Sequence, residues 1–481
     1  MTATLAPFSL RSTLALDAPT SATATTVRTG TGVTVAVIDS GLLLDGGSAT
    51  RLKTTRDFTT GNANPPAIGP MDAYGHGTHI GGLIGGNQAE IKGVAPNVSY
   101  VSLRVLDQFG VGSTSNVIKA IEWAIANKAT YGIDVINLSL GHPIYEPAPT
   151  DPLVQAAESA VRAGIVVVAA AGNIGMNPLT GQTGYAGITS PGNAPSAITV
   201  GAFKTQDTTR RSDDLVADYS SRGPTWYDAF AKPDVVAPGH RLVAAAATSQ
   251  TLHTLFPSLR QSLGGRPYLM LSGTSMAAGV VSGTVAVMLE ESKATFGAAP
   301  PPNAIKAMLQ TTAFPMQNAS GASYDVLTQG AGALNPAGAL TLAASINPTI
   351  PVNTNWLVTG VTETTVIDGQ TLAWANQIVW DDNIVWGTEV YAHNVAWDDN
   401  IVWGTSADDN IVWGTSLDNI VWGTTIDDNI VWGTNVVWGT NIVWGTNIVW
   451  GTSLDDNIVW GTCSDDNIVW GTSLAVLTSA N

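Results

Sequence analysis

Short runs of apolar, often β-branched residues alternate with longer amphipathic segments between residues 27 and 345. The apolar runs lie at 33–38, 98–105, 135–140 and 165–170, and apolar residues recur at helical spacing in 115–128 and 151–163. The runs are apolar on both faces, so helices must cover both sides of the sheet that they form. The alternation predicts an α/β domain with a doubly wound, mostly parallel sheet, and Ser115 is the expected N-cap of the first helix.

Polar side chains mark the ends of three of these runs. Asp39 follows the first run, Ser139 stands near the end of the third, and Asn173 follows the fourth. Ligands of open parallel sheets bind beyond the carboxyl ends of the strands, so we expect these side chains near one site. Alone, an aspartate in such a place is more often a loop cap or a ribose ligand.

A serine and a histidine complete the set. Ser275 stands where a helix of small residues is expected to begin, and His76 opens the segment His76–His79. A serine hydroxyl is a poor nucleophile unless a base takes its proton and donors stabilise the oxyanion that follows its attack. The chain supplies these groups in the order Asp39, His76, Asn173, Ser275.

Three segments around these residues resemble the signature blocks of the subtilases, the subtilisin-like serine proteases. They are Val35–Gly41, His76–Gly82 and Gly273–Ala278, and the resemblance extends over about residues 27–340. It implies a subtilisin-like peptidase domain over 27–345. It also implies an endopeptidase of broad specificity that cleaves protein or peptide substrates through an acyl-enzyme.

The resemblance further implies a role for each residue. Ser275 would be the nucleophile, His76 its general base, and Asp39 the group that orients the imidazole. Asn173 and a backbone N–H at the start of the helix would bind the oxyanion. The alternative for Asn173 is a turn residue, because Gly-Asn pairs are common in loops. His79 would be a neighbour of the base.

Substrate contacts follow from the same resemblance. Two segments resemble the walls of the pocket for the residue before the cut, and a third resembles the edge that pairs with the substrate backbone. The walls are Ser139, Leu140, Gly141 and Ala170, Ala171, Gly172, and the edge is Gly110, Val111, Gly112. Small residues let an extended peptide approach closely. The alternative is that all three are ordinary turns.

The chain departs from the family pattern after the nucleophile. Where subtilases usually continue Ala-Ala-Pro-His, this chain reads Ala277-Ala278-Gly279-Val280. Proline in the first turn of a helix fixes the backbone, whereas glycine costs about 1 kcal/mol against alanine. We expect a looser start of the helix and an altered rate rather than loss of activity.

The expected chemistry requires no cofactor. Many subtilases bind calcium, but the segment Gly85–Gly93 contains a single acid, Glu90, so no metal ligand is assigned. Cys463 is the only cysteine, which excludes an intrachain disulfide.

The remaining parts of the chain are a lead-in over 1–26, a linker over 346–377 and a repeat region over 378–481. The lead-in is expected to be flexible, and the first 30 residues lack the apolar stretch of a signal peptide. No run approaches 18 apolar residues, so no membrane span is expected. The family resemblance implies a secreted or cell-surface protein made with a propeptide, for which 26 residues are too few.

The repeat region is acidic and rich in tryptophan. No lysine or arginine follows Lys306, whereas 17 of the 37 acidic residues do, which argues against nucleic acid or an anionic membrane as its partner. The hexad Asn-Ile-Val-Trp-Gly-Thr recurs from Ile378, often with an inserted Ser-Leu-Asp-Asp or a close variant. Tryptophans six apart (432, 438, 444, 450) and ten apart (450, 460, 470) would keep one face of an extended chain. Spacings of eleven and nine, from Trp386 to Trp397 and from Trp413 to Trp422, fit this less well.

Short β-strands in an irregular sheet or solenoid, or disorder, are the two structures that this pattern allows. The paired aspartates favour solvated turns that keep the strands from aggregating. A calcium array and exposed tryptophan faces that bind carbohydrate or a cell surface are the alternatives, and the repeat could also self-associate. Two rival functions follow: a surface-binding or assembly protein with a vestigial protease domain, and an esterase built on the same site.

Overall fold

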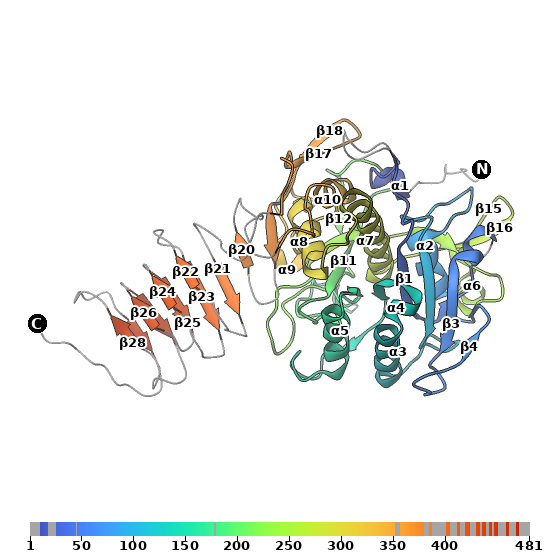
Figure 1. Ribbon diagram of the computed structural model, residues 1–481, viewed down its shortest axis with the longest axis horizontal. Coiled ribbons are helices and arrows are strands. Elements are labelled where there is room, and N and C mark those ends of the chain that lie inside the picture. Colours follow the sequence, from blue (N-terminus) through green and yellow to red (C-terminus); the bar gives the residue numbers. More distant parts are fainter. Residues whose placement is uncertain are drawn as a thin grey trace, which may run out of the picture. The chain divides into compact units, whose positions relative to one another are not determined.

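The computed structural model describes residues 10–17, 26–44, 46–177, 179–351 and 356–379, and beyond these the backbone of short strands between Ile384 and Trp470. The chain forms two compact units (Figure 1). The first contains residues 1–351 and 356–375, and the second contains 352–355 and 376–481. Each unit is considered by itself.

A nine-stranded sheet is the centre of the first unit. Its order is β12-β11-β9-β7-β1-β6-β3-β4, with β13 also paired to β11, and only the edge strands β4 and β12 are antiparallel. The strands are β1 Thr34–Asp39, β3 Leu52–Asp57, β4 Ala67–Ile68, β6 Ser99–Arg104, β7 Ile133–Leu138, β9 Val166–Ala170, β11 Ile198–Lys204, β12 Leu215–Val216 and β13 Val235–Pro238.

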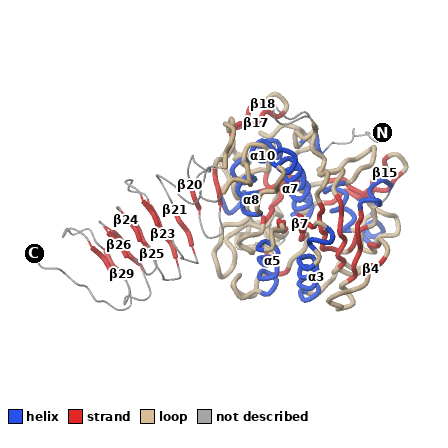
Figure 2. The backbone as a smooth tube through the Cα atoms, viewed as in Figure 1, coloured by secondary structure: helices blue, strands red, loops and turns tan. Residues whose placement is uncertain are grey.

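Helices cover both faces of this sheet, which confirms the predicted doubly wound α/β fold (Figure 2). One face packs α3 Thr114–Ala126 and α5 Pro152–Arg162, and the core there includes Ala36 and Ile38 of β1. The other face packs α2 His76–Gly85 and α7 Thr274–Phe296. Since neighbouring strand residues point to opposite faces, Val35 and Val37, which are also fully buried, face the second layer.

The remaining helices of the first unit are short or peripheral: α1 Leu10–Thr13, α4 Lys128–Tyr131, α6 Thr251–Leu255, α8 Pro302–Thr312, α9 Val326–Gln329 and α10 Pro336–Ala343. A three-stranded sheet contains β14 Leu242–Ala245, β15 Arg260–Leu263 and β16 Arg266–Leu271. Two small pairs join β2 Gly41–Leu42 to β5 Met71–Asp72 and β8 His142–Pro143 to β10 Thr189–Ser190.

Helix boundaries test the sequence expectations. Helix α5 begins as expected. Asp151 is its N-cap, and the Asp151 side chain accepts hydrogen bonds from the backbone N–H groups of Leu153 (2.8 Å) and Val154 (3.3 Å). The expected N-cap Ser115 is wrong. Helix α3 already includes Thr114, and the extended residue before it, Ser113, is the N-cap.

Parts of the lead-in and of the expected linker pack on the first unit. Arg11 is buried and its guanidinium donates to the backbone oxygens of Leu16 and Val94. Within 346–377, strands β17 Thr364–Ile367 and β18 Gln370–Ala373 form a hairpin. Trp374 follows it, is 5% exposed, and donates from its indole to Thr365 Oγ1 (2.8 Å).

The second unit contains two parallel sheets, with consecutive strands assigned to alternate sheets. One has the order β21-β23-β25-β27-β29 and the other β22-β24-β26-β28. Their bounds are β21 Ile401–Gly404, β22 Ile411–Trp413, β23 Asn419–Gly423, β24 Ile430–Trp432, β25 Asn435–Trp438, β26 Ile442–Trp444, β27 Asn447–Trp450, β28 Ile458–Trp460 and β29 Ile468–Trp470. An antiparallel pair, β19 Gln377–Val379 and β20 Ile384–Trp386, precedes them.

In both sheets, tryptophan pairs with tryptophan in register. The nine-residue spacing from Trp413 to Trp422 joins β22 to β23, which belong to different sheets. The odd spacing therefore falls between sheets and disturbs the register of neither. Trp397 lies outside the described residues.

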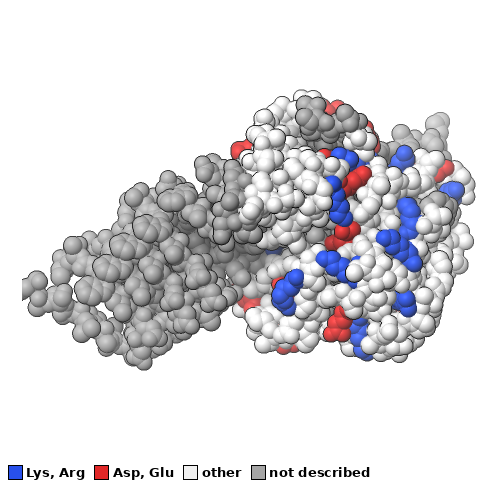
Figure 3. Space-filling view, viewed as in Figure 1, with Lys and Arg blue, Asp and Glu red and all other residues white. Residues whose placement is uncertain are grey.

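On the face in Figure 3, lysine and arginine side chains lie among aspartate and glutamate rather than in one patch. None of the helices in the described ranges is both long and apolar enough to cross a membrane.

Candidate active site

Asp39 and His76 meet where β1 ends and α2 begins. Asp39 is the last residue of β1 and is fully buried, and His76 is the first residue of α2. Both carboxylate oxygens of Asp39 lie 2.9 Å from His76 Nδ1. Since a carboxylate only accepts, Nδ1 carries the proton and Nε2 is left as the basic nitrogen.

A second carboxylate fixes the start of α2. Asp72 is 5% exposed and accepts hydrogen bonds from the backbone N–H of Gly75 (2.8 Å) and from the N–H and hydroxyl of Thr78 (2.8 and 2.7 Å). The sequence analysis missed Asp72. Its place four residues before His76, ahead of a helix start, is the signal that could have found it.

Glycine allows α2 to approach β1. A Cβ on Gly77 would lie 2.1 Å from the backbone oxygen of Gly41, so no other residue fits without a shift of the backbone. The Gly77 N–H donates to Ser40 Oγ (2.9 Å), which ties the helix to the residue after Asp39.

The charges around His76 make it a stronger base. Burial disfavours the imidazolium and acts to lower the pKa of His76, but Asp39 and then Asp72 favour it, and the net result is a pKa above the ordinary value. His79 differs because burial, and then the nearby His76, lower its pKa to about 4. Its Nε2 lies 3.1 Å from the backbone oxygens of Leu242 and of Leu269, so this neutral ring links α2 to β14 and β16.

Ser275 is the second residue of α7 and is half-buried. Among the described residues, its hydroxyl donates to the backbone oxygen of Ser139 (3.1 Å) and not to His76. Catalytic hydrogen bonds often form only when substrate arrives, so this geometry does not exclude His76 as the base.

A series of buried, hydrogen-bonded polar side chains contacts the backbone of Ser275. The Ser139 hydroxyl lies 2.9 Å from the backbone oxygen of Ser275 and 2.9 Å from Asn137 Oδ1. Asn137 Nδ2 donates to Ser282 Oγ (3.0 Å), and both of these residues are fully buried. The end of β7 is thus tied to two positions of α7. Sequence reasoning proposed Ser139 as part of a substrate pocket wall and missed Asn137 and Ser282.

Asn173 caps α7 from another part of the chain. Its Oδ1 accepts from the N–H of Thr274 (2.9 Å) and from the hydroxyl of Thr274 (3.1 Å), while Thr274 Oγ1 accepts from the N–H of Gly172 (3.1 Å). A backbone N–H can only donate, so the amide oxygen must face the helix. The exposed Asn173 side chain therefore directs its NH₂ away from Thr274, beside the start of α7.

Two of the three expected substrate segments line one cavity with His76. The cavity measures about 440 Å³ and includes all of Gly110–Gly112 and Ser139–Gly141. Residues that the sequence analysis did not propose complete its lining: Tyr74, Leu106, Ser113, Thr114, Val117, His142 and Leu153. A Cβ on Gly110, whose φ is +77°, would lie 2.5 Å from the Tyr74 ring, so glycine is required there.

The third segment, Ala170–Gly172, is not among the residues that line this cavity. Ala170 and Ala171 are buried, and the Ala171 backbone bonds to Val200 and Thr189 of neighbouring strands. The Gly172 N–H bonds to Thr274 Oγ1 of α7 (3.1 Å).

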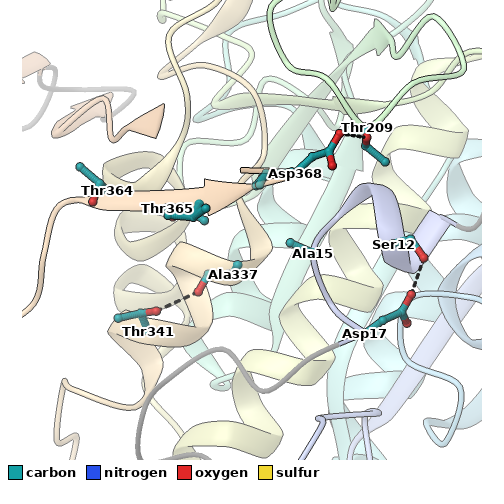
Figure 4. Close-up of a pocket in the computed structure, with 11 residues that line it drawn as sticks. Ser12, Ala15, Asp17, Thr209, Ala337, Thr341, Thr364, Thr365 and Asp368 are labelled. Atoms are coloured by element: carbon teal, nitrogen blue, oxygen red, sulfur yellow. Dashed lines mark hydrogen bonds between the residues drawn. The ribbon is translucent and has the colours of Figure 1, made fainter. Parts of the chain in front are cut away.

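Size alone does not identify the site. A larger cavity of about 580 Å³ lies between α1, α10 and the hairpin β17–β18 (Figure 4). Several of its polar groups are paired, as in the bond from Thr209 Oγ1 to Asp368 Oδ2 (2.8 Å), and it contains none of the expected catalytic residues. In the described ranges no three His, Cys, Asp or Glu side chains form a metal-binding cluster.

A buried Asp–His pair, a serine at a helix start and an amide side chain beside it are the groups that serine hydrolases combine in their active sites. The subtilase family model matches residues 30–339, and the chain belongs to the subtilase family.

Known relatives and a solved structure resemble part of this chain. The chain is 36% identical over 272 residues to serine protease AprX and to subtilisin E, both of Bacillus subtilis strain 168. Each match covers 55% of this chain, and it covers 58% of AprX and 57% of subtilisin E, so the chain spans little more than half of these relatives. The crystal structure of a cold adapted subtilisin-like serine proteinase matches with 27% identity and a TM-score of 0.46, covering 68% of this chain and 96% of that one.

Proposed function

We propose that the protein is a serine endopeptidase that cleaves peptide bonds through an acyl-enzyme. The observation that carries this proposal is the pair of 2.9 Å contacts from the buried Asp39 carboxylate to His76 Nδ1. This pair leaves Nε2 free as a base. His76 and Ser139 line the same cavity, and the backbone oxygen of Ser139 accepts a hydrogen bond from the Ser275 hydroxyl.

The steps follow from these groups. Ser275 Oγ attacks the scissile carbonyl while His76 Nε2 takes its proton and then gives it to the leaving amine. Asp39 keeps Nδ1 protonated and stabilises the imidazolium. The amide of Asn173 and the N–H groups at the start of α7 donate to the oxyanion. No step of this mechanism needs a metal or a cofactor, and calcium stays unassigned.

We propose broad specificity, because an extended substrate can pair along Gly110–Gly112 while Ser139–Gly141 forms the opposite wall. The resemblance assigns Ala170 and Ala171 to a wall as well, and their burial leaves Gly172 as the residue of that segment best placed to contact substrate. The names of the relatives, a serine protease and a subtilisin, support the reaction class.

The test compares the full chain with its Ser275→Ala variant, using a fluorophosphonate probe and casein, each with and without a chelator. We expect labelling and cleavage by the parent alone. Ester hydrolysis without casein cleavage would indicate the esterase instead, because a protease must also protonate an amine. A folded parent that is not labelled would support the vestigial domain.

A second function is favoured by the in-register pairing of the repeat. Each strand pairs with a near-identical neighbour, and β29 and β28 each have one described partner, so a second copy of the chain could add at their open edges. We propose self-association there in preference to binding of a cell surface. Sedimentation of the Ser275→Ala chain tests this, and a monomer at all concentrations would contradict it.

Export is the localisation that the family resemblance implies, and we propose it for this protein. Fractionation of the source cells tests it.

A further inference from the structure

A glutamine distant in the chain packs beside the start of α2. Gln250 lies in the segment between β14 and β15, immediately before α6, and its side chain is fully buried. Gly75, the residue before His76, has φ +106°, and a Cβ there would lie 3.1 Å from both Cβ and Oε1 of Gln250. The glutamine side chain therefore packs against the residue that leads into the candidate base. A buried amide needs hydrogen-bond partners, and those of Gln250 show what it holds in place.

The Gln250 amide connects two parts of the chain. Its Oε1 accepts a hydrogen bond from the backbone N–H of Ala247 (2.7 Å), and its Nε2 donates to Thr78 Oγ1 (3.0 Å). A backbone N–H can only donate, so Oε1 must face Ala247 and Nε2 is left to face Thr78. Thr78 is the third residue of α2, which means that the amide reaches the first turn of the helix that His76 begins.

The Thr78 hydroxyl joins Gln250 to Asp72. This hydroxyl donates to Asp72 Oδ2 (2.7 Å) and accepts from Gln250 and from the N–H of Leu43 (3.0 Å). A hydroxyl has one donor and two acceptor sites, so all of its capacity is used. The network links Gln250 both to the carboxylate that favours the imidazolium of His76 and to the stretch of chain that follows β1.

The same segment also holds the residues between Asp72 and the base. Thr251 N–H donates to the backbone oxygen of Ala73 (2.9 Å), and Leu252 N–H donates to that of Tyr74 (3.0 Å). Tyr74 lines the cavity that contains His76. The approach to α2 is thus fixed by backbone bonds as well as by the Gln250 side chain.

We propose that Gln250 is a positioning residue for His76. This inference rests on the proposed endopeptidase function and adds a residue of the β14–β15 segment to it. Gln250 touches no reacting atom; it acts through Thr78 and Asp72 on the first turn of α2, which keeps His76 Nδ1 on the Asp39 carboxylate. A shift of about 1 Å in a catalytic group can cost about 100-fold in rate, so a buried support of this kind has a measurable effect on catalysis.

The first test observes the His76 ring and needs no cleavage. It is an NMR titration of the histidine Cε1–H signals in the full chain that carries Ser275→Ala, with and without Gln250→Met, which removes the amide at similar volume. Burial, which lowers the pKa of His76, remains in the variant, whereas the carboxylates that raise this pKa are held less closely. We expect Gln250→Met to lower the pKa of His76.

The second test measures catalysis in the active chain. Hydrolysis of a peptide anilide is expressed per active site, counted with a fluorophosphonate probe, because a purely structural defect reduces the number of sites and not the kcat of each. We expect Gln250→Met to lower kcat about ten-fold and to change KM little. Gln329→Met is the matched control. Gln329 is 8% exposed and likewise bridges two groups, the N–H of Met316 (2.8 Å) and the oxygen of Tyr324 (2.7 Å), and its loss should leave both kcat and the pKa of His76 unchanged.

Variants of Thr78 test the route. Thr78→Val should reproduce the effects of Gln250→Met, whereas Thr78→Ser keeps the hydroxyl and should retain the parental values. The double variant Thr78→Val, Gln250→Met should lose no more than the larger single loss, because both changes interrupt one network. Circular dichroism melts show whether each variant is folded, and if Gln250→Met is not, the comparison of Thr78→Val with Thr78→Ser decides.

An unchanged pKa of His76 in folded Gln250→Met, or additive losses in the double variant, would overturn the positioning role. The two proposals fail separately. A parent chain whose Ser275 is not labelled, with a lowered His76 pKa in Gln250→Met, refutes the endopeptidase and leaves the positioning role standing. A labelled parent with neither the pKa nor kcat altered in Gln250→Met refutes the positioning role alone.

Discussion

Asn173 performs two tasks that substitution can separate. Its Oδ1 accepts from Thr274 N–H at 2.9 Å and from the Thr274 hydroxyl at 3.1 Å, and its NH₂ is the proposed oxyanion donor. Asn173→Asp keeps an oxygen that caps α7, and its charge suits a helix N-terminus. The same change removes the donor and places a negative charge beside the oxyanion. Asn173→Ala removes both the cap and the donor.

The magnitudes differ between the two variants. Loss of one oxyanion donor costs about 100- to 1000-fold in kcat, a value known for the equivalent donor in subtilisin. Loss of a cap costs about 1 kcal/mol of stability. We therefore expect Asn173→Asp to lose at least 100-fold in kcat with an unchanged free energy of unfolding. Asn173→Ala should lose a similar factor in kcat and also about 1 kcal/mol.

The assay is hydrolysis of a short peptide anilide, paired with denaturant unfolding of each variant. Asn173→Asp with more than a tenth of the parent kcat would refute the assignment of Nδ2 as a donor. Asn173→Ala with parental stability would refute the capping role instead, because the hydrogen bond from Thr274 N–H to Oδ1 would then contribute nothing to the free energy of unfolding.

Further predictions follow from α7 and from His76. Gly279→Ala should stabilise the protein by about 1 kcal/mol, because its Cβ would meet Ile80 Cγ2 at 3.5 Å, an ordinary contact, and a denaturant melt that shows destabilisation would contradict this. The pKa of His76 is raised above 6.5, so kcat/KM should fall in acid with a midpoint above that value, measured as a pH–rate profile, and a midpoint below 6 would contradict it. The native state binds the His76 proton more tightly than the unfolded state does. The contribution of the His76–Asp39 pair to the free energy of unfolding is therefore complete below pH 6.5 and is lost as pH rises through the native pKa. Activity changes in the opposite direction, because the base must be unprotonated.

Several features of the site were predictable from local pattern. Consecutive residues show a buried strand that ends in a polar residue, as at Asp39. They also show a helix that begins with small residues, as at Ser275. The fold class followed likewise, because alternating strand and helix periods allow few arrangements.

Other features depend on residues far apart in the chain. Asn137 and Ser282 were missed because their hydrogen bond joins positions 145 residues apart, which no motif records. Ala170 and Ala171, expected as a substrate wall, are buried beside neighbouring strands, a degree of burial that no single segment reveals.

The sequence by itself determined which side chains could do the chemistry and which layers would carry them, since residue types and periods are local properties. The tertiary structure decided how those side chains are held. Ser139 reaches Ser275 across 136 residues, and Asn173 reaches Thr274 across 101. Which atom of the Asn173 amide faces the helix, and which oxygen accepts the hydrogen bond of the Ser275 hydroxyl, depend on packing of distant segments.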